Sequence, residues 1–126
     1  MEYKLILNTS FITLNEYIKA ERSHKYVAAA IKLKQTSKVH YLARSLKFTL
    51  PENKKFDVEF NWYKPNNKTD HDNIAFAKKF ILDGLVISNI LKSDGAKYIN
   101  NFTDNFILDK SRLYISCVVI FKEISK

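Results

Sequence analysis

The residues Asp70-His71-Asp72-Asn73 form the part of the sequence whose types and spacing could do chemistry. Asp70 and Asp72 are two positions apart, so in an extended segment both carboxylates point to the same side. Converging carboxylates repel each other unless a cation lies between them, and Mg²⁺ prefers oxygen ligands. Asp94 lies in a short loop further along the chain and could fold back to the pair. Such a cluster can bind one or two Mg²⁺ ions, activate a water molecule and stabilise the leaving oxygen of a phosphodiester.

The same acids also have an ordinary structural explanation. Asp72 can be the N-cap of the helix that follows, and Asp70 can be an acid of the preceding loop. Asp94 can be a turn residue beside Gly95. An isolated D-x-D pattern is weak by itself and favours this explanation over a metal site.

Two adjacent lysines in the helix after these acids differ in their geometry relative to Asp72. At about 100° per residue, Lys79 lies within about 20° of the helical stripe that carries Asp72, whereas Lys78 is about 120° away. Helical side chains lean toward the N-terminus, so Lys79 is directed back to the acids, where an ammonium group could bind the scissile phosphate. Asp83 follows Lys79 by four residues and is expected to support it. For Lys78 we expect a solvated position on the helix face.

The first half of the chain shows clear signals for the elements that must position these residues. Residues 2–8 and 56–62 alternate between apolar and polar side chains, which is the pattern of half-buried strands. Thr13 and Glu16 fit a capping box at a helix N-terminus. The run from there to about residue 46 contains no Gly or Pro, which predicts one long helix, slackened near Thr36-Ser37.

The second half predicts a helix followed by two strands. The helix runs from about residue 72 or 73 to Leu85, and Gly84 near its end suits a helix exit. The strands cover about 97–108 and 112–122, with a hairpin at 109–111 between them. The resulting order, β-α-β-α-β-β, predicts one α+β domain over residues 1–126, with a mixed or antiparallel sheet packed on two helices.

Composition and charge indicate the kind of partner. The 126 residues include 21 Lys and Arg against 13 Asp and Glu, a formal net charge of +8, which implies attraction to polyanions such as nucleic acid. No apolar run approaches the roughly 18–20 residues that a membrane-spanning helix needs, and the N-terminus lacks the pattern of a signal peptide. The single Cys117 excludes a disulfide framework within the chain and a multi-cysteine zinc site. We therefore expect a cytoplasmic protein with no membrane partner.

Eight cations are candidates for contacts with DNA phosphates. Most lie in the predicted first helix, and two lie near the acids: Lys19, Arg22, Lys25, Lys32, Lys34, Lys38, Lys68 and Lys78. Each contact with a phosphate would steepen the salt dependence of DNA binding. A solvated lysine-rich surface explains the same residues equally well.

Taken in order, Asp70-His71-Asp72-Asn73-Ile74, Lys79-Phe80-Ile81-Leu82-Asp83-Gly84-Leu85 and Leu91-Lys92-Ser93-Asp94-Gly95 resemble the signature of the RusA family. These are Holliday-junction resolvases, found largely in phages and prophages. The family pattern is an acidic D-x-D-N, a helix with K-x-x-x-D-x-L, and a loop that ends in Asp before the next strand. The match is close over residues 70–95, and the length, basicity and predicted element order agree over the whole chain.

The resemblance implies a small homodimeric endonuclease that depends on Mg²⁺, with Mn²⁺ as a substitute. Such an enzyme resolves four-way DNA junctions by paired symmetric nicks, in recombination and repair in a bacterial or phage-infected cell. Matched by position, the metal-binding acids are Asp70, Asp72 and Asp94. Lys79 matches the catalytic lysine, and we expect supporting roles for Asn73 and Asp83.

The sequence departs from the family pattern in two places. Nine residues separate Asn73 from Asp83, more than in compact members, so the choice of Lys79 depends on anchoring the helix at Asp83. Ser93 precedes Asp94, where some members have a second acid. Two other functions stay open: a non-catalytic basic DNA-binding protein, and a nuclease selective for flaps or other branched DNA.

Overall fold

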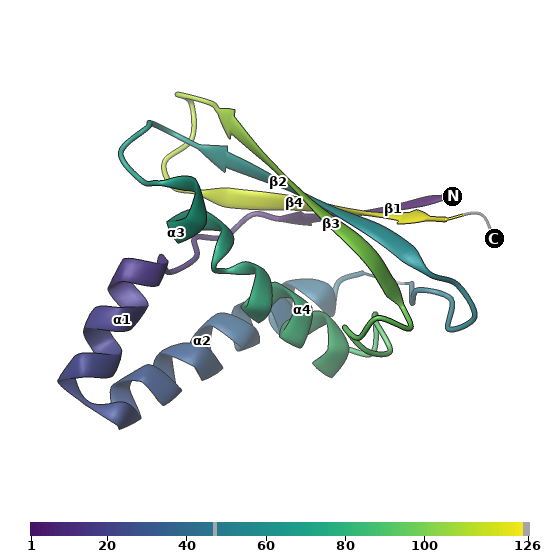
Figure 1. The fold of residues 1–126 in the computed structure, drawn as a ribbon, viewed down its shortest axis with the longest axis horizontal. Helices are drawn as coiled ribbons and strands as arrows, with labels where there is room; N and C mark the ends of the chain where they lie inside the picture. Colours follow the sequence, from purple (N-terminus) through teal and green to yellow (C-terminus); the bar gives the residue numbers. More distant parts are fainter. Residues whose placement is uncertain (47, 125–126) are drawn as a thin grey trace.

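A mixed four-stranded sheet forms one layer of the protein, and helices cover one of its faces (Figure 1). The structure is a computed structural model that describes residues 1–46 and 48–124, without the side chain of Lys25. The elements are β1 (Glu2–Leu7), α1 (Leu14–Ser23), α2 (Lys25–Ala43), β2 (Phe56–Lys64), α3 (His71–Ala75), α4 (Lys78–Ile87), β3 (Ile99–Leu108) and β4 (Ser116–Glu123). The predicted α+β class with a mixed sheet is confirmed. No helix in these residues is long and apolar enough to cross a membrane.

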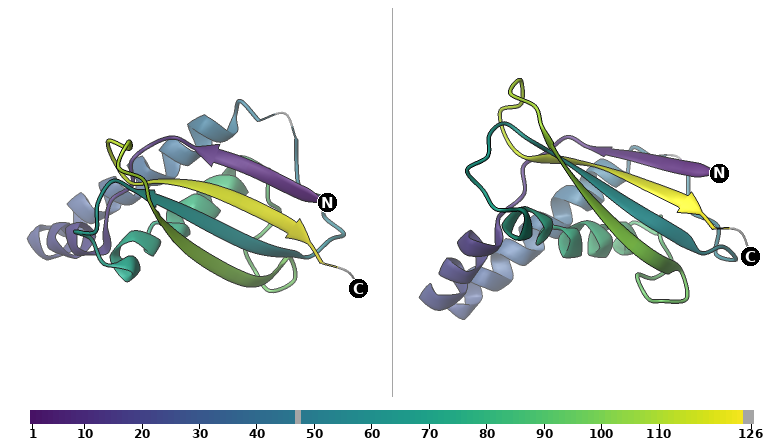
Figure 2. Two further views of the ribbon diagram at one scale, coloured as in Figure 1. Left: turned by 90° about the horizontal axis from the view of Figure 1, so that it is seen from above. Right: turned by 45° about the horizontal axis from the view of Figure 1, so that its top comes forward.

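The strand order is β1-β4-β2-β3, with β4 antiparallel to both of its neighbours and β3 parallel to β2. Parallel strands cannot be joined by a tight turn, so the chain must cross over the sheet between β2 and β3. This crossover, residues 65–98, contains α3 and α4 together with the whole D-x-D-N to Asp94 segment. The start of β1 and the end of β4 lie side by side at one end of the sheet (Figure 2), where Glu123 N–H donates a hydrogen bond to Met1 O at 3.1 Å.

The hydrophobic core lies between the sheet and the helices. Alternate residues of β2 are buried, including the largest core side chain, Trp62, and they pack with apolar residues of α4 such as Ile81 and Leu85. Period-2 alternation places these strand residues on one face, as the sequence predicts. Cys117 of β4 belongs to this core, and its burial raises the pKa of the thiol.

The predicted single helix over about 13–46 is wrong, because the chain forms two helices that meet at His24. His24 has an extended backbone (φ −170°, ψ 134°), and its Nδ1 accepts a hydrogen bond from Tyr26 N–H at 3.2 Å. The capping box of Thr13 and Glu16 is confirmed, whereas Thr36 lies within a regular part of α2. No Gly or Pro marks this change of direction at His24. The break between the helices lets α1 pack on α3 while α2 packs on α4.

The predicted second helix is also interrupted, at Phe76-Ala77, which separates α3 from α4. Gly84 lies inside α4 rather than at its exit, and the residue with a left-handed backbone after the helix is Asn89 (φ 62°). Gly84 is needed where α4 meets α2. A Cβ atom there would lie 2.5 Å from Cβ of Val39.

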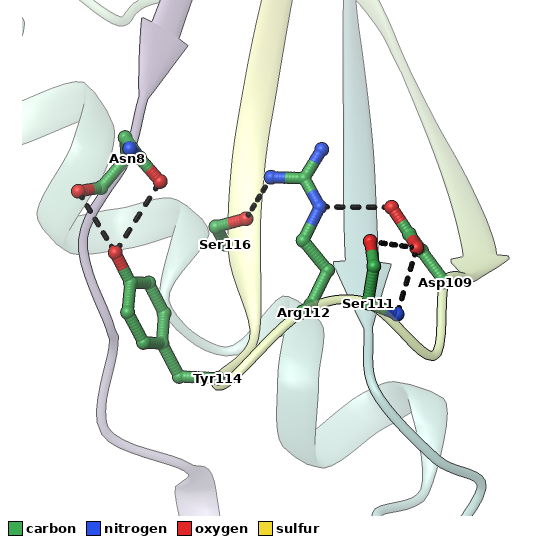
Figure 3. Close-up of polar contacts among 6 residues, drawn as sticks. All are labelled: Asn8, Asp109, Ser111, Arg112, Tyr114 and Ser116. Atoms are coloured by element: carbon green, nitrogen blue, oxygen red, sulfur yellow. Dashed lines mark hydrogen bonds and ion pairs between the residues drawn. The ribbon is translucent and has the colours of Figure 1, made fainter.

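The predicted hairpin at 109–111 is wrong, because β2 lies between β3 and β4 in the sheet. The connection between these two strands covers residues 109–115, so β4 begins at Ser116. Side chains stabilise this connection (Figure 3). The Asp109 carboxylate accepts hydrogen bonds from Ser111 Oγ at 2.6 Å and from Arg112 Nε at 3.0 Å. The hydroxyl of Tyr114 donates to the backbone oxygen of Asn8 at 3.2 Å, which ties the connection to the end of β1.

Gly84→Ala is expected to destabilise the protein by about 1–3 kcal/mol, because the new methyl group overpacks the contact with Val39. Helix propensity alone would favour alanine by about 1 kcal/mol, so the sign of the change reports the helix contact. Urea unfolding measures the effect. Gly95→Ala is the control, since a Cβ there meets only Ser93 Oγ, at 3.4 Å. A stabilised Gly84→Ala variant would contradict the close approach of α2 and α4.

Candidate active site

The crossover between β2 and β3 lines two hollows that contain the predicted catalytic residues. The first, which we call the α3 hollow, is lined by Lys64, Asn67, Thr69, Asp70, His71 and Asp72. The second, the α4 hollow, is lined by Phe76, Lys78, Lys79, Leu82, Asp94 and Phe102. Asp70 and Asp72 are therefore brought together in one hollow, and Asp94 lies with Lys79 in the other.

Strand β3 anchors both hollows through alternate side chains. The ring of Phe106 stacks on His71 with centroids 3.8 Å apart and an angle of 6° between the planes. Asp104 binds Lys78 at 2.7 Å, and the ammonium group of Lys78 lies 4.9 Å from the ring centroid of Phe102. Because Phe102, Asp104 and Phe106 are spaced by two, they share the face of β3 that meets α3 and α4.

Asp70 and Asp72 are exposed, and neither carboxylate makes a hydrogen bond or ion pair with another described residue. The premise of an extended D-x-D segment is wrong, since Asp72 lies in the first turn of α3. The ordinary explanation of Asp72 as an N-cap is wrong as well. Asp70 occupies the N-cap position, but its side chain makes no capping hydrogen bond. Both carboxylates are thus uncommitted, that is, without a hydrogen bond or ion pair to the described residues.

Lys79 lies between two carboxylates in the α4 hollow. Its Nζ is 3.1 Å from Asp83 Oδ1, the predicted i, i+4 partner, and 3.4 Å from Asp94 Oδ2. The hydrogen bond that Lys79 donates to Asp83 and the charges of both acids raise the pKa of Lys79, so the amine stays protonated at neutral pH. Lys79 can therefore supply a fixed positive charge but not act as a base. The predicted stripe joining it to Asp72 does not apply, because the helix is interrupted at Phe76-Ala77.

Among the described residues, no three or more His, Cys, Asp or Glu side chains lie together so that they could hold a metal ion. The predicted trio of Asp70, Asp72 and Asp94 is divided between the two hollows. The donor chemistry of the α3 hollow still fits Mg²⁺, since two free carboxylates are the ligands this ion prefers.

Asn73 supports the α3 hollow by fixing α3 to α1. Its side chain is buried, and its Oδ1 accepts a hydrogen bond from Asn15 N–H at 3.0 Å. This contact joins the first turns of two helices that are 58 positions apart in the sequence. The expected supporting role of Asn73 is therefore given a physical basis in the position of α3.

Asp104 was missed by the sequence reasoning. Its Oδ1 accepts a hydrogen bond from the indole Nε1 of Trp62 at 2.9 Å, while its Oδ2 binds Lys78. Lys78, expected in solvent, is instead half-buried in this network. The signal that could have identified Asp104 is an acid flanked at two residues on either side by Phe102 and Phe106, that is, on the inward face of a strand.

The candidate DNA-binding cations differ in how free they are. Lys38 donates to the backbone oxygen of Ser10 at 3.1 Å, and burial together with the charge of Lys34 lowers its pKa. The side chain of Lys25 lies outside the described part of the chain. Five of the candidates are exposed: Lys19, Arg22, Lys32, Lys34 and Lys68.

Comparison of the chain with protein-family models and with curated proteins finds no match. The resemblance to RusA resolvases therefore rests on residues 70–95 and stays a prediction.

Asp104→Ala is expected to destabilise the protein by about 2–3 kcal/mol, because it leaves Lys78 and the buried Trp62 indole without their shared acceptor. Thermal unfolding measures the loss, and the emission of Trp62, the only tryptophan, reports the lost hydrogen bond directly. Asp57→Ala is the control, since it removes one exposed hydrogen bond from Asn100. Equal losses in the two variants would contradict a special role for the Asp104 network.

Proposed function

We propose that the protein is a Mg²⁺-dependent endodeoxyribonuclease that resolves four-way DNA junctions by paired nicks. The observation that carries this proposal is the pair of uncommitted carboxylates, Asp70 and Asp72, exposed together in one hollow. Two carboxylates that no local contact explains, on the same crossover as a lysine and a third acid, suit phosphodiester hydrolysis better than a structural role.

Five charged residues have a defined part in this proposal. Asp70 and Asp72 would hold the metal ion, which when bound activates water and neutralises charge on the phosphate. Lys79 presents its protonated amine to the phosphate, where charge develops during cleavage. Asp83 and Asp94 orient that amine. Asp94 would join the metal ligands only by leaving Lys79.

The positive charge supports DNA as the substrate. The net charge of +8 includes exposed cations on α1 and α2 and Lys68 beside the α3 hollow. Such residues bind phosphates without reading the base sequence. Paired nicks need two sites related by two-fold symmetry, so the proposal includes a homodimer acting in the cytoplasm of a bacterial or phage-infected cell.

A non-catalytic DNA-binding protein is the second candidate, and one observation favours it. Lys79 neutralises Asp94, and the described residues contain no cluster of three acids. In that case the acids would only orient lysines on a DNA-binding surface.

Nicking of a synthetic four-way junction in Mg²⁺ is expected, and Asp72→Asn should reduce its rate by about 100-fold or more, because a metal-binding charge is lost. Nicked strands are measured on denaturing gels. Asp57→Asn, at the start of β2, is the matched control and should cleave like the natural protein.

Binding without nicking, or equal nicking by Asp72→Asn, would refute the enzyme and favour the second candidate. The same assay with flap and three-way substrates tests the substrate. Faster cleavage of flaps than of the junction would identify a nuclease of broader branched-DNA specificity. Mn²⁺ is expected to replace Mg²⁺, and a chelator should stop the reaction.

A further inference from the structure

Lys64, the last residue of β2, is the one buried cation among the lysines and arginines whose side chains the structure describes. It is 7% exposed and follows Phe60 and Trp62 on the inward face of the strand. The adjacent Tyr63 is half-buried on the other face. The side chain of Lys64 therefore lines the α3 hollow on its buried side, whereas Asp70 and Asp72 line it at the protein surface.

The ammonium group of Lys64 has no carboxylate partner within the described residues. Its Nζ lies 3.3 Å from Nε2 of His71, and it takes part in none of the ion pairs. Lys78, which is less buried, has Asp104 at 2.7 Å. Withdrawing a cation from water is costly, and buried charges in proteins are normally paired. The α3 hollow therefore contains a buried positive charge that is not paired, since Asp70 and Asp72, which line the same hollow, form no ion pair with it.

The surrounding contacts hold this charge in one place. The backbone oxygen of Lys64 accepts a hydrogen bond from Asp109 N–H at 2.8 Å, and the guanidinium of Arg112 lies 4.5 Å from the Tyr63 ring. Asp109 and Arg112 are themselves joined in the connection drawn in Figure 3. On the other side, His71 is fixed by stacking on Phe106. A fixed cation is suited to binding an anion in a defined position.

We propose that Lys64 binds a DNA phosphate that enters the α3 hollow beside Asp70 and Asp72. This inference rests on the proposed function and names a substrate-binding residue that the sequence did not indicate. A nonbridging phosphate oxygen takes the place of the missing anion and accepts a hydrogen bond from Nζ. His71 keeps the ammonium group directed into the hollow.

The proposal predicts opposite effects on stability and binding for Lys64→Met. Methionine retains the apolar stem and removes an uncompensated buried charge, so the temperature of unfolding should rise. Affinity for the four-way junction should fall by about tenfold or more, because a charged hydrogen bond is lost. Lys64→Arg retains the charge and should bind nearly as well as the natural protein.

Fluorescence anisotropy with a labelled four-way junction, in a chelator so that no cleavage occurs, measures the affinity over a series of salt concentrations. Losing one phosphate contact should reduce the slope of log affinity against log salt by about 0.9 in Lys64→Met. Lys54→Met is the control, since Lys54 is exposed and precedes the opposite end of β2. It should leave both the affinity and the slope unchanged.

A junction with single neutral methylphosphonates at the crossover locates the contact. At the phosphate that Lys64 binds, the natural protein and Lys64→Met should have equal affinity, whereas the tenfold difference should persist at other positions. If the tenfold difference in affinity persists at every methylphosphonate position, a direct contact between Lys64 and a phosphate is refuted. Loss of both stability and binding in Lys64→Met, without rescue by arginine, would show a structural role and also overturn it.

The proposal and the proposed function fail in different ways. If the natural protein binds the junction and Lys64→Met binds equally well with the same slope, the role of Lys64 is refuted and the nuclease proposal stands. If the natural protein does not bind the junction, the proposed function is refuted and the role of Lys64 falls with it.

Discussion

Parallel pairing of β2 with β3 obliges the chain to cross over the sheet, and this crossover carries every residue of the two hollows except Lys64 of β2 and Phe102 of β3. The crossover would be loosely placed without fixed contacts, because α3 is only five residues long. Its position is set by three contacts to other elements: the stacking of His71 on Phe106, the ion pair of Lys78 with Asp104, and the hydrogen bond between Asn15 and Asn73. The candidate site residues are thus positioned by side-chain contacts to other elements as well as by the strand connections.

Charged groups near the crossover fall into two sets: those with an oppositely charged partner in the fold and those without one. Lys78 and Asp104 satisfy each other and Trp62, so their charges are used within the fold. Asp70, Asp72 and Lys64 have no oppositely charged partner among the described residues, although Lys64 is buried. A fold that satisfies one set so fully and leaves the other unsatisfied is typical of a protein whose second set meets a ligand.

The features that could be predicted from the sequence are those set by residues close together in the chain. The strand alternation of β2, the capping box of Thr13 and Glu16, and the pairing of Lys79 with Asp83 follow from periods of two and four residues. The two helix interruptions, at His24 and at Phe76-Ala77, could not be predicted, because no Gly or Pro marks them and they depend on tertiary packing. Lys64 and Asp104 escaped for a related reason. Local alternation can place such residues on the inward face of a strand, but it does not report what that face meets. That depends on the pairing of β2 with β3, which begins 35 residues after β2 ends.

Strand β3 lies at the edge of the sheet, so only one of its two sides is hydrogen bonded to another described strand. Strands of this kind open locally at a lower free energy than central strands do. Phe106 and Asp104 belong to the same short stretch of β3, and each holds a different hollow. A transient opening of this one edge would therefore release α3 and the start of α4 together, and amide hydrogen exchange in the two hollows would be coupled.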